Sequence, residues 1–218
     1  MDLVVLASGH GSNLRAIAAA IDEGTCDARL AAVISDRGTA PALEFAAERG
    51  VPTQVLPLRK GDDRDAWNER LANAMAQHDP DLVVLAGFMR VVGKPVLERF
   101  AGRMINVHPA LLPAFPGMDG PRQAVEAGVR ISGCTVHVVD EGVDTGPILA
   151  QAAVPVLPDD DPDALHHRIQ AQEHRLLPRV VHWIATGALR LVPEPHFTVS
   201  LEGTEDHLVF PRLPGARR

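Results

Sequence analysis

The chain has 218 residues, of which 46% are hydrophobic and 22% are charged, as in an ordinary globular domain. Its net charge of −7 argues against a nucleic-acid-binding surface, and its two cysteines are too few for a disulfide framework. No stretch approaches the roughly 18 apolar residues of a membrane span, and the first apolar run, 3–7, is too short for a signal peptide. We therefore expect a cytoplasmic protein that binds neither nucleic acid nor membrane.

The first half of the chain alternates strand patterns with helical patterns. Each strand pattern is a short aliphatic run, which is typical of strands covered on both faces in a parallel sheet. Four strands separated by three helices predict a Rossmann-like, doubly wound α/β sheet with helices on both faces. Ligands of such sheets bind beyond the carboxyl ends of the strands, so the turns after Ala7, Ala86 and His108 should share one rim. The strand patterns cover 3–7, 30–35, 51–56 and 81–86, and the helical patterns cover 14–21, 41–48 and 62–77.

The second half predicts a more varied architecture. A strand at 104–108 is followed by an ordered loop at 109–121 and a short helix at 122–127. Alternating patterns at 132–139 and 148–156 predict a hairpin, whose antiparallel strands would make the sheet mixed at its C-terminal end. A long helix opens at Asp161 and Pro162 and ends near Gly187, and 189–192 suits a last short strand. We expect one catalytic domain over 1–192 and a loosely packed tail over 193–218, where proline recurs and periodicity fades.

The turn after the first strand, Ser8 to Asn13, is rich in glycine and leads into a helix. Glycine lets the backbone approach a ligand closely, and the free N–H groups of a helix N-terminus favour a phosphate. The full dinucleotide fingerprint and the P-loop lysine are both missing, so a mononucleotide or a phosphosugar suits the turn better than a dinucleotide. The same residues would equally suit a tight turn in which Ser12 or Asn13 caps the helix.

Three polar side chains form a candidate catalytic set. Asn106 and His108 alternate with apolar residues on one strand, and Asp144 lies in a loop bounded by glycines. An amide N–H suits an oxyanion, a histidine moves protons near neutral pH, and a neighbouring carboxylate raises the pKa of that histidine. Neither Ser132 nor Cys134 lies in a nucleophile elbow, so direct transfer between two bound substrates is favoured. From residue types alone, the alternative is that Asn106 is a structural asparagine and His108 is a core histidine. No set of His, Cys and carboxylate residues in the sequence has the spacing of a zinc site, so no metal is predicted.

Four strings of the sequence carry a family resemblance: ASGHGSNL (7–14), LAGFMR (85–90), INVHPALLPAFPG (105–117) and GCTVHVVDEGVDTGPIL (133–149). Together they resemble the glycinamide ribonucleotide formyltransferases, folate-dependent enzymes of purine biosynthesis. The hairpin string is specific to folate formyltransferases as a group, and the Gly-Ser-Asn loop narrows the resemblance to the ribonucleotide enzymes. The resemblance extends to about Arg190 and implies a formyltransferase fold.

The resemblance also implies a role for individual residues. Asn106 and protonated His108 would stabilise the oxyanion of a tetrahedral intermediate, formed when the amine of N1-(5-phospho-D-ribosyl)glycinamide attacks a formyl carbon. Asp144 would raise the pKa of His108. The ribonucleotide would be bound by Gly11, Ser12, Asn13 and Glu173, with Gln170 as a neighbouring candidate one turn before Glu173. The co-substrate 10-formyltetrahydrofolate would be bound by Arg64, Met89, Arg90, Val91, Val92, Asn106, Asp140, Val143 and Asp144. These small molecules are the implied partners of a monomer or homodimer that needs no metal.

One loop departs from the family pattern. The family commonly carries histidines after Pro116, whereas this chain reads Gly117-Met118-Asp119-Gly120-Pro121. Asp119 could not supply the same hydrogen-bond donor, although Arg122 is within reach along the chain.

Other functions remain as alternatives to the ribonucleotide reaction. One is another folate formyl enzyme, namely formyltetrahydrofolate hydrolase, an amino-sugar formyltransferase or methionyl-tRNA formyltransferase. The last two usually carry a further C-terminal domain, and the hydrolase usually carries an N-terminal one. A different class of alternative is a phosphosugar-binding module without catalysis, which would have no reason to keep Asn106, His108 and Asp144.

Overall fold

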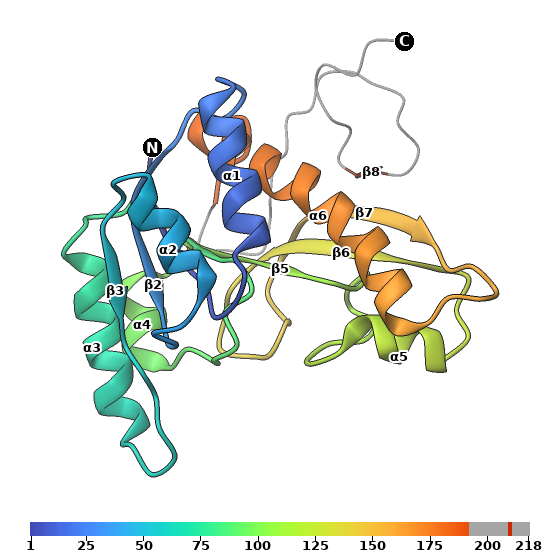
Figure 1. The fold of residues 1–218 in the computed structure, drawn as a ribbon, viewed down its shortest axis with the longest axis horizontal. Helices are drawn as coiled ribbons and strands as arrows, with labels where there is room; N and C mark the ends of the chain where they lie inside the picture. The colour runs from blue at the N-terminus through green and yellow to red at the C-terminus, as the bar shows by residue number, and fades with distance from the viewer. Residues whose placement is uncertain (192–208, 211–218) are drawn as a thin grey trace.

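The protein folds around one mixed sheet with the strand order β3-β2-β1-β4-β5-β6-β7-β8 (Figure 1). The computed structural model describes residues 1–191 and 209–210. The strands from β3 to β5 are parallel neighbours, whereas β6, β7 and β8 each pair antiparallel with the strand before them. The predicted mixed, doubly wound sheet is therefore confirmed. The strands are β1 (Asp2–Leu6), β2 (Arg29–Ser35), β3 (Thr53–Val55), β4 (Leu82–Leu85), β5 (Met104–His108), β6 (Ile131–Val138), β7 (Ile148–Pro155) and β8 (Val209–Phe210).

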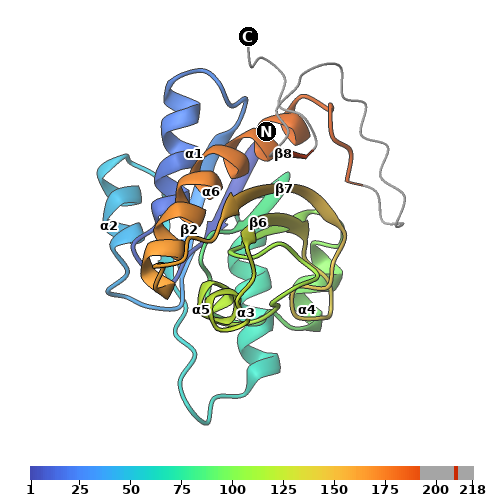
Figure 2. The same ribbon diagram turned by 90° about the vertical axis from the view of Figure 1, so that its right-hand side faces the viewer.

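Helices cover both faces of this sheet (Figure 2). Successive side chains of a strand point to opposite faces, and β1 shows this directly, since Leu3 and Val5 belong to one core cluster and Val4 and Leu6 to the other. Residues of α1, α2, α5 and α6 pack in the first cluster, and residues of α3 and α4 pack in the second. The helices are α1 (Ser12–Asp22), α2 (Pro41–Glu48), α3 (Arg64–Ala76), α4 (Lys94–Arg99), α5 (Gly120–Glu126) and α6 (Pro162–Ala185).

The secondary structure differs from the sequence expectations in two places. The helix α4 was not predicted, because it has only six residues and buries one side chain, Val96, which leaves too short a pattern to recognise. The predicted strand at 189–192 is absent over 189–191. There the backbone N–H of Leu189 donates to the carbonyl of Trp183 at 2.9 Å, so this segment closes the end of α6 instead of joining the sheet.

The predicted boundary between domain and tail is described only in part. Apart from β8, which pairs with β7, the predicted loosely packed tail lies outside the described residues. Within the described part of the chain, no helix has the length and apolarity to cross a membrane.

Candidate active site

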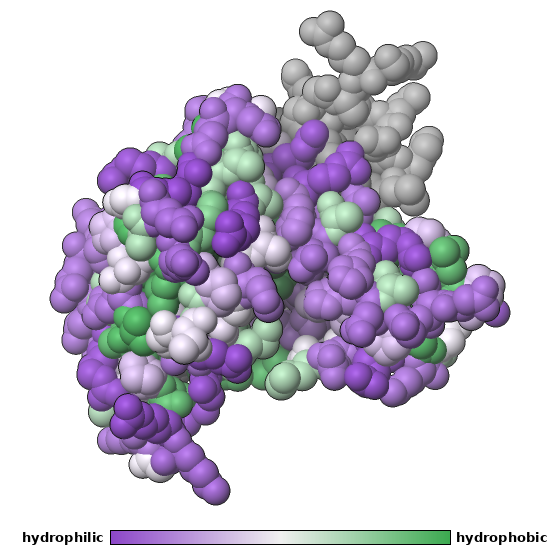
Figure 3. Space-filling model, viewed as in Figure 1, coloured by the Kyte–Doolittle hydropathy of each residue, from purple (hydrophilic) through white to green (hydrophobic). Residues whose placement is uncertain are grey.

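A cavity of about 540 Å³ lies beyond the carboxyl ends of β1, β4 and β5, and we call it the main cavity. From β1 the chain continues to β2 on one side, and from β4 it continues to β5 on the other side. Open α/β sheets bind ligands at the point where the strand order reverses in this way. Figure 3 shows the surface hollowed between the half that carries α1 and α2 and the half that carries α5 and α6. The turns after β1, β4 and β5 all line this cavity, so the predicted shared rim is confirmed.

The main cavity has two ends. The α1 end is formed by Gly11, Ser12, Asn13, Gln170 and Glu173, and the loop end is formed by 89–92, 117–119, Asp140 and 142–144. Asn106 and His108 line the floor of the cavity. Every residue that the sequence proposed for the site therefore lines this cavity except Arg64, which lines a neighbouring one.

The three candidate catalytic side chains meet around the carboxylate of Asp144. Asn106 and His108 come from the same face of β5, two residues apart. The Nδ1 atom of His108 lies 3.3 Å from Oδ2 of Asp144, and Nδ2 of Asn106 lies 3.4 Å from Oδ1. The backbone N–H of Gly117 donates to Oδ2 at 2.8 Å. The loop between β6 and β7 thus brings a carboxylate to the end of β5, as the sequence predicted.

Both ring nitrogens of His108 face acceptors. Opposite Asp144, the Nε2 atom lies 2.8 Å from the backbone carbonyl oxygen of Phe115. A carbonyl oxygen and an ionised carboxylate can only accept, so each is best satisfied when the facing nitrogen carries a proton.

His137 is a member of this cluster that the sequence analysis did not propose. Its Nε2 atom lies 3.4 Å from Oδ1 of Asp144 and 3.2 Å from Nδ2 of Asn106, and its Nδ1 lies 2.9 Å from the carbonyl oxygen of Val138. It arrives there because β6 runs antiparallel beside β5, with Asn106 and His137 paired in register. The alternation of 132–139 could have placed His137 on one face, but the sequence did not reveal that β5 and β6 are neighbours.

Asp144 is held ionised by its neighbours. Burial alone would raise the pKa of this carboxyl, but hydrogen bonds from His137 and from the Gly117 N–H, with the positive charges of His108 and His137, lower it below its usual range. Asp144 also adopts a left-handed backbone, with φ of 56°. Such a conformation is uncommon for a residue other than glycine and is often found where a side chain must be aimed at a site.

At the α1 end, the helix N-terminus is open to a ligand. Gly11 precedes α1 in a left-handed conformation, with φ of 72°, and no side chain caps the first turn. The alternative in which Ser12 or Asn13 caps the helix is therefore wrong, because Gly11 occupies the cap position. A Cβ atom on Gly11 would lie 2.8 Å from Cβ of Ala42 in α2, so close packing of the two helices also requires glycine. The uncapped N–H groups suit an anion such as a phosphate.

Deeper at the α1 end lie two buried polar side chains, Glu173 and Asn13, which are hydrogen-bonded to each other. Glu173 is 4% exposed, and its Oε2 atom accepts a 2.9 Å hydrogen bond from Nδ2 of Asn13. Burial raises the pKa of Glu173, and the bond from Asn13 only partly offsets this. The Oδ1 atom of Asn13 is buried with no hydrogen-bond partner among the described residues. Such acceptors suit a ligand that brings hydroxyl or amine donors. Gln170 adjoins them and donates to Oγ of Ser12 at 3.2 Å.

The loop end is apolar and open. Met89, Val91, Met118 and Val143 line it and are between 50% and 81% exposed, which is unusual for side chains of this size. Beneath them, Nε of Arg90 pairs with the buried carboxylate of Asp36 at 2.7 Å. Exposed apolar residues around a cavity with a few polar groups favour a ligand that presents apolar surface to them.

The loop that departs from the family pattern also lines the loop end. Asp119 lies directly before α5 with φ of 63°, and Nε of Arg122 lies 3.4 Å from its Oδ2 atom. Both side chains line the main cavity. Arg122 therefore lies beside Asp119, within reach of the place where the resemblance predicts histidine. Over 1–191 and 209–210, no cluster of His, Cys, Asp and Glu has the arrangement of a metal site.

Comparison with known proteins agrees with this geometry. The family described as formyl transferase matches residues 1–181. The phosphoribosylglycinamide formyltransferase of Mycobacterium tuberculosis is 52% identical over 190 residues, which cover 87% of each chain. The enzyme of the same name from Escherichia coli is 41% identical over 191 residues, covering 88% of this chain and 90% of that one.

A solved structure supports the same relationship. The glycinamide ribonucleotide transformylase 1 of Symbiobacterium toebii superposes with a TM-score of 0.87 at 44% identity, covering 91% of this chain and 93% of that chain. A family match to most of the chain, close relatives of similar length and a shared fold point to one conclusion. The chain belongs to the formyl transferase family, and within it to the phosphoribosylglycinamide formyltransferases.

Proposed function

We propose that this enzyme transfers the formyl group of 10-formyltetrahydrofolate to the amine of N1-(5-phospho-D-ribosyl)glycinamide. The observation that carries the proposal is that one cavity joins an uncapped helix N-terminus to an apolar loop end, with Asn106, His108 and Asp144 between them. The α1 end offers a phosphate site and buried acceptors, which fit a phosphosugar. The loop end offers exposed apolar side chains, which fit the ring faces of a folate.

The catalytic roles follow from the contacts of these three side chains. The substrate amine attacks the formyl carbon, and the formyl oxygen becomes an oxyanion that needs donors. Asn106 supplies an amide N–H, and His108 supplies the Nε2–H of a charged ring once the formyl oxygen replaces the carbonyl oxygen of Phe115, which lies 2.8 Å from that atom. The Nδ1 atom of His108 lies 3.3 Å from the carboxylate of Asp144, which favours the charge on the ring and fixes its orientation. His137 holds the other oxygen of Asp144 and thus acts as a positioning residue.

The residues at the two ends of the cavity have different binding roles. Gly11, Ser12 and Asn13 hold the phosphate through the first turn of α1, while Glu173 and Gln170 bind the sugar. The folate is bound by 89–92 and by Asp140, Val143 and Asp144 of the β6–β7 loop, with Arg64 beyond the cavity.

A covalent enzyme intermediate is not part of the proposal. Cys134 is buried, and burial raises the pKa of its thiol far above neutral, which leaves no reactive thiolate. Ser132 is buried as well, and its hydroxyl has no hydrogen-bond partner in the described part of the chain that could act as a base. The two substrates therefore react directly with each other.

The remaining parts of the proposal concern the protein as a whole. We assign residues 1–192 to one catalytic domain that acts in the cytoplasm as a monomer or homodimer. The family match to residues 1–181 and the single sheet over the described residues support one domain.

An absorbance assay of folate deformylation, run with and without glycinamide ribonucleotide, tests the function. We expect turnover only when the ribonucleotide is present, with formylated ribonucleotide and tetrahydrofolate as products in equal amounts. Turnover that ignores the ribonucleotide would instead indicate a formyltetrahydrofolate hydrolase. Binding of both ligands without turnover would indicate a phosphosugar-binding module that lacks catalysis.

A further inference from the structure

Asp36, the residue that directly follows β2, carries a fully buried carboxylate. It does not line the main cavity, and neither does Ser8, the buried residue beside it at the end of β1. Removing a carboxylate from water is costly unless its oxygens are paired. Both oxygens of Asp36 are paired, since Oδ1 accepts from Oγ of Ser8 at 2.6 Å and Oδ2 accepts from Nε of Arg90 at 2.7 Å.

Ser8 connects this carboxylate to residues 87–90 after β4, which we call the β4 turn. The hydroxyl of Ser8 donates to Asp36, and its oxygen accepts the backbone N–H of Met89 at 2.8 Å. The backbone N–H of Ser8 also donates to the carbonyl oxygen of Gly87 at 3.1 Å. Because β2, β1 and β4 are neighbours in the sheet, these hydrogen bonds join the ends of three consecutive strands.

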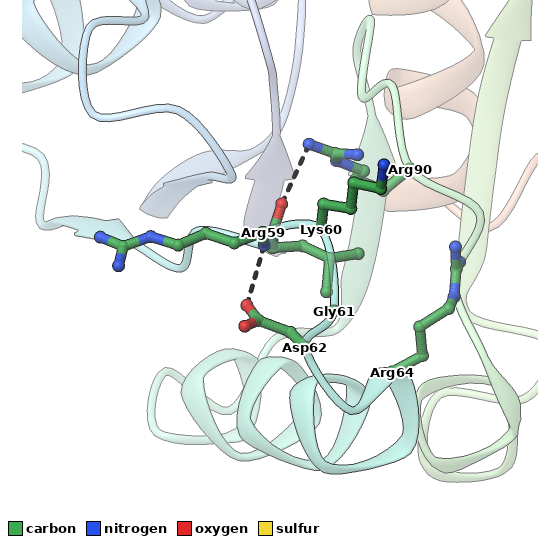
Figure 4. A pocket seen from close by; sticks show the side chains of 7 residues that line it. Arg59, Lys60, Gly61, Asp62, Arg64 and Arg90 are labelled. Atoms are coloured by element: carbon green, nitrogen blue, oxygen red, sulfur yellow. Dashed lines mark hydrogen bonds between the residues drawn. The ribbon is translucent and has the colours of Figure 1, made fainter.

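The side chain of Arg90 is held at two of its nitrogens. Besides the bond from Nε to Asp36, Nη2 of Arg90 donates to the carbonyl oxygen of Leu58 at 3.3 Å (Figure 4). Met89 and Arg90 both line the loop end of the main cavity. Asp36 therefore fixes two successive residues of the loop end, one through Ser8 and the other directly.

The β4 turn has few apolar contacts that could fix its shape instead. The side chain of Met89 is 58% exposed, and a Cβ atom added to Gly87 would meet no atom within 4 Å among the described residues. A segment with little packing opens easily unless its polar groups are paired. Without the oxygen of Ser8, the N–H of Met89 would lose its partner, and the turn would shift until that group reached water.

We propose, on the basis of the folate site assigned above, that Asp36 is a positioning residue for folate binding. Acting through Ser8 and Arg90, it holds the β4 turn in the conformation that accepts the folate. When only a fraction of the protein has the competent conformation, the apparent affinity falls by that fraction. An unpaired buried N–H is costly enough to reduce the fraction about tenfold, so the affinity for folate should fall about tenfold when the network is broken.

The α1 end should not depend on this network. The glycine turn after β1 has a separate anchor, because the backbone N–H of Ala42 in α2 donates to the carbonyl oxygen of Gly9 at 3.2 Å. Asn13 and Glu173, on helices α1 and α6, are bonded to each other. Breaking the network should therefore leave the affinity for the ribonucleotide unchanged.

Titration calorimetry with tetrahydrofolate and with glycinamide ribonucleotide tests this proposal. Ser8→Ala removes the acceptor of the Met89 N–H, and Asp36→Asn leaves a single acceptor oxygen where the carboxylate has one for each partner. Each variant should bind tetrahydrofolate about tenfold more weakly than the wild-type protein. The double variant should lose much less than the roughly hundredfold of two independent effects, because both residues act on the same turn.

Asp160→Asn is the matched control. Oδ2 of Asp160 pairs with Nη1 of Arg168 at 2.6 Å and accepts the backbone N–H of Leu157 at 2.8 Å, so this variant also removes a carboxylate bonded to an arginine and to a second donor. Asp160 does not line the main cavity. Urea unfolding measures the stability of every variant, and Asp160→Asn should lose stability while keeping its affinity for tetrahydrofolate.

Each result decides between the positioning role and the proposed function. Wild-type affinity for tetrahydrofolate in folded Ser8→Ala and Asp36→Asn, or additive losses in the double variant, would overturn the positioning role and leave formyl transfer untouched. Equal losses for both ligands, or the same loss in Asp160→Asn, would also overturn it, because the effect would then follow stability. A wild-type protein that binds no tetrahydrofolate would overturn both proposals. A non-additive loss confined to tetrahydrofolate supports the inference.

Discussion

The two ends of the main cavity are built from different kinds of structure. At the α1 end, the polar groups belong to helices α1 and α6 and are buried, and Asn13 is bonded to Glu173 before any ligand arrives. At the loop end, large apolar side chains are exposed on loops, and two of the loop residues other than glycine, Asp119 and Asp144, have positive φ. The α1 end is thus preorganised by regular structure, whereas the loop end needs a ligand to cover its apolar side chains.

The floor between these ends should show the largest effect of mutation. We expect Asp144→Asn to lower kcat by a factor on the order of 10³. The new amide carries no negative charge, so it holds His108, His137 and the Gly117 N–H less well than the carboxylate does. Steady-state kinetics with both substrates measures this. Glu141→Gln, which alters an exposed carboxylate in the same loop, serves as the control. Near-normal turnover of Asp144→Asn would contradict the catalytic assignment.

Asn106→Ala tests the other side of the floor. Loss of an oxyanion donor costs about 10²–10³ in kcat, and we expect a decrease of that size with little change in either KM. Because Asn106 also contacts Asp144 and His137, circular dichroism and thermal unfolding should first establish that the variant folds. A variant that folds and turns over like the wild type would remove Asn106 from the mechanism.

At the α1 end, Glu173→Gln should change binding more than catalysis. Hydrogen bonds to charged groups contribute about 1.5–3 kcal/mol, so the KM for the ribonucleotide should rise roughly tenfold to a hundredfold. The KM for the folate should stay the same, since Glu173 lies at the other end of the cavity. Equal changes in both KM values would mean that the two ends do not act separately.

The same variant should also make the protein more stable. The folded-state pKa of Glu173 is raised, so the ionised form disfavours folding above the pKa of the unfolded chain. Wild-type stability should therefore increase as the pH falls from 7 toward the usual pKa of a glutamate, and Glu173→Gln should not show that increase. Urea unfolding at pH 7 and pH 5 measures the difference between the two proteins.

At the loop end, Val143→Ser should have the smallest effect. Val143 is half exposed, and removal of its apolar contact with a folate costs about 1 kcal/mol, which is roughly fivefold in the folate KM. The ribonucleotide KM should not change. Ile131→Ser, which alters another exposed aliphatic side chain on β6 outside both cavities, should change neither value.

Local patterns in the sequence predicted most of the fold. The helix α2 and the strand β5 begin and end where their patterns predicted, because each has clear boundaries in proline, glycine or a change of polarity. The six-residue α4 escaped detection because one buried residue gives no periodicity. The segment 189–191 has the composition of a strand, but its backbone bonds to α6, and only the tertiary structure decides that competition.

The candidate site was predictable where residues cluster in short motifs. Asn106, His108 and Asp144 were found from strand ends and a glycine-bounded loop, and the structure brings them together. His137 was missed because its position depends on the pairing of β5 with β6, which are separated by a loop and by α5. The carbonyl of Phe115 was missed for a similar reason, since no sequence pattern shows which backbone group will face His108.

The contact between Gly11 and Ala42 has a consequence for how the protein tolerates change. Ala42 lies on α2 and is fully buried, and it belongs to neither end of the main cavity. Its Cβ atom nevertheless lies 2.8 Å from the position that a Cβ atom on Gly11 would take, so Ala42 packs directly against that glycine. Position 42 should therefore accept few residues in a library of variants, and enlarged side chains there should weaken phosphate binding before they unfold the domain. The packing of Ala42 against Gly11 thus limits the substitutions that the enzyme accepts at this position.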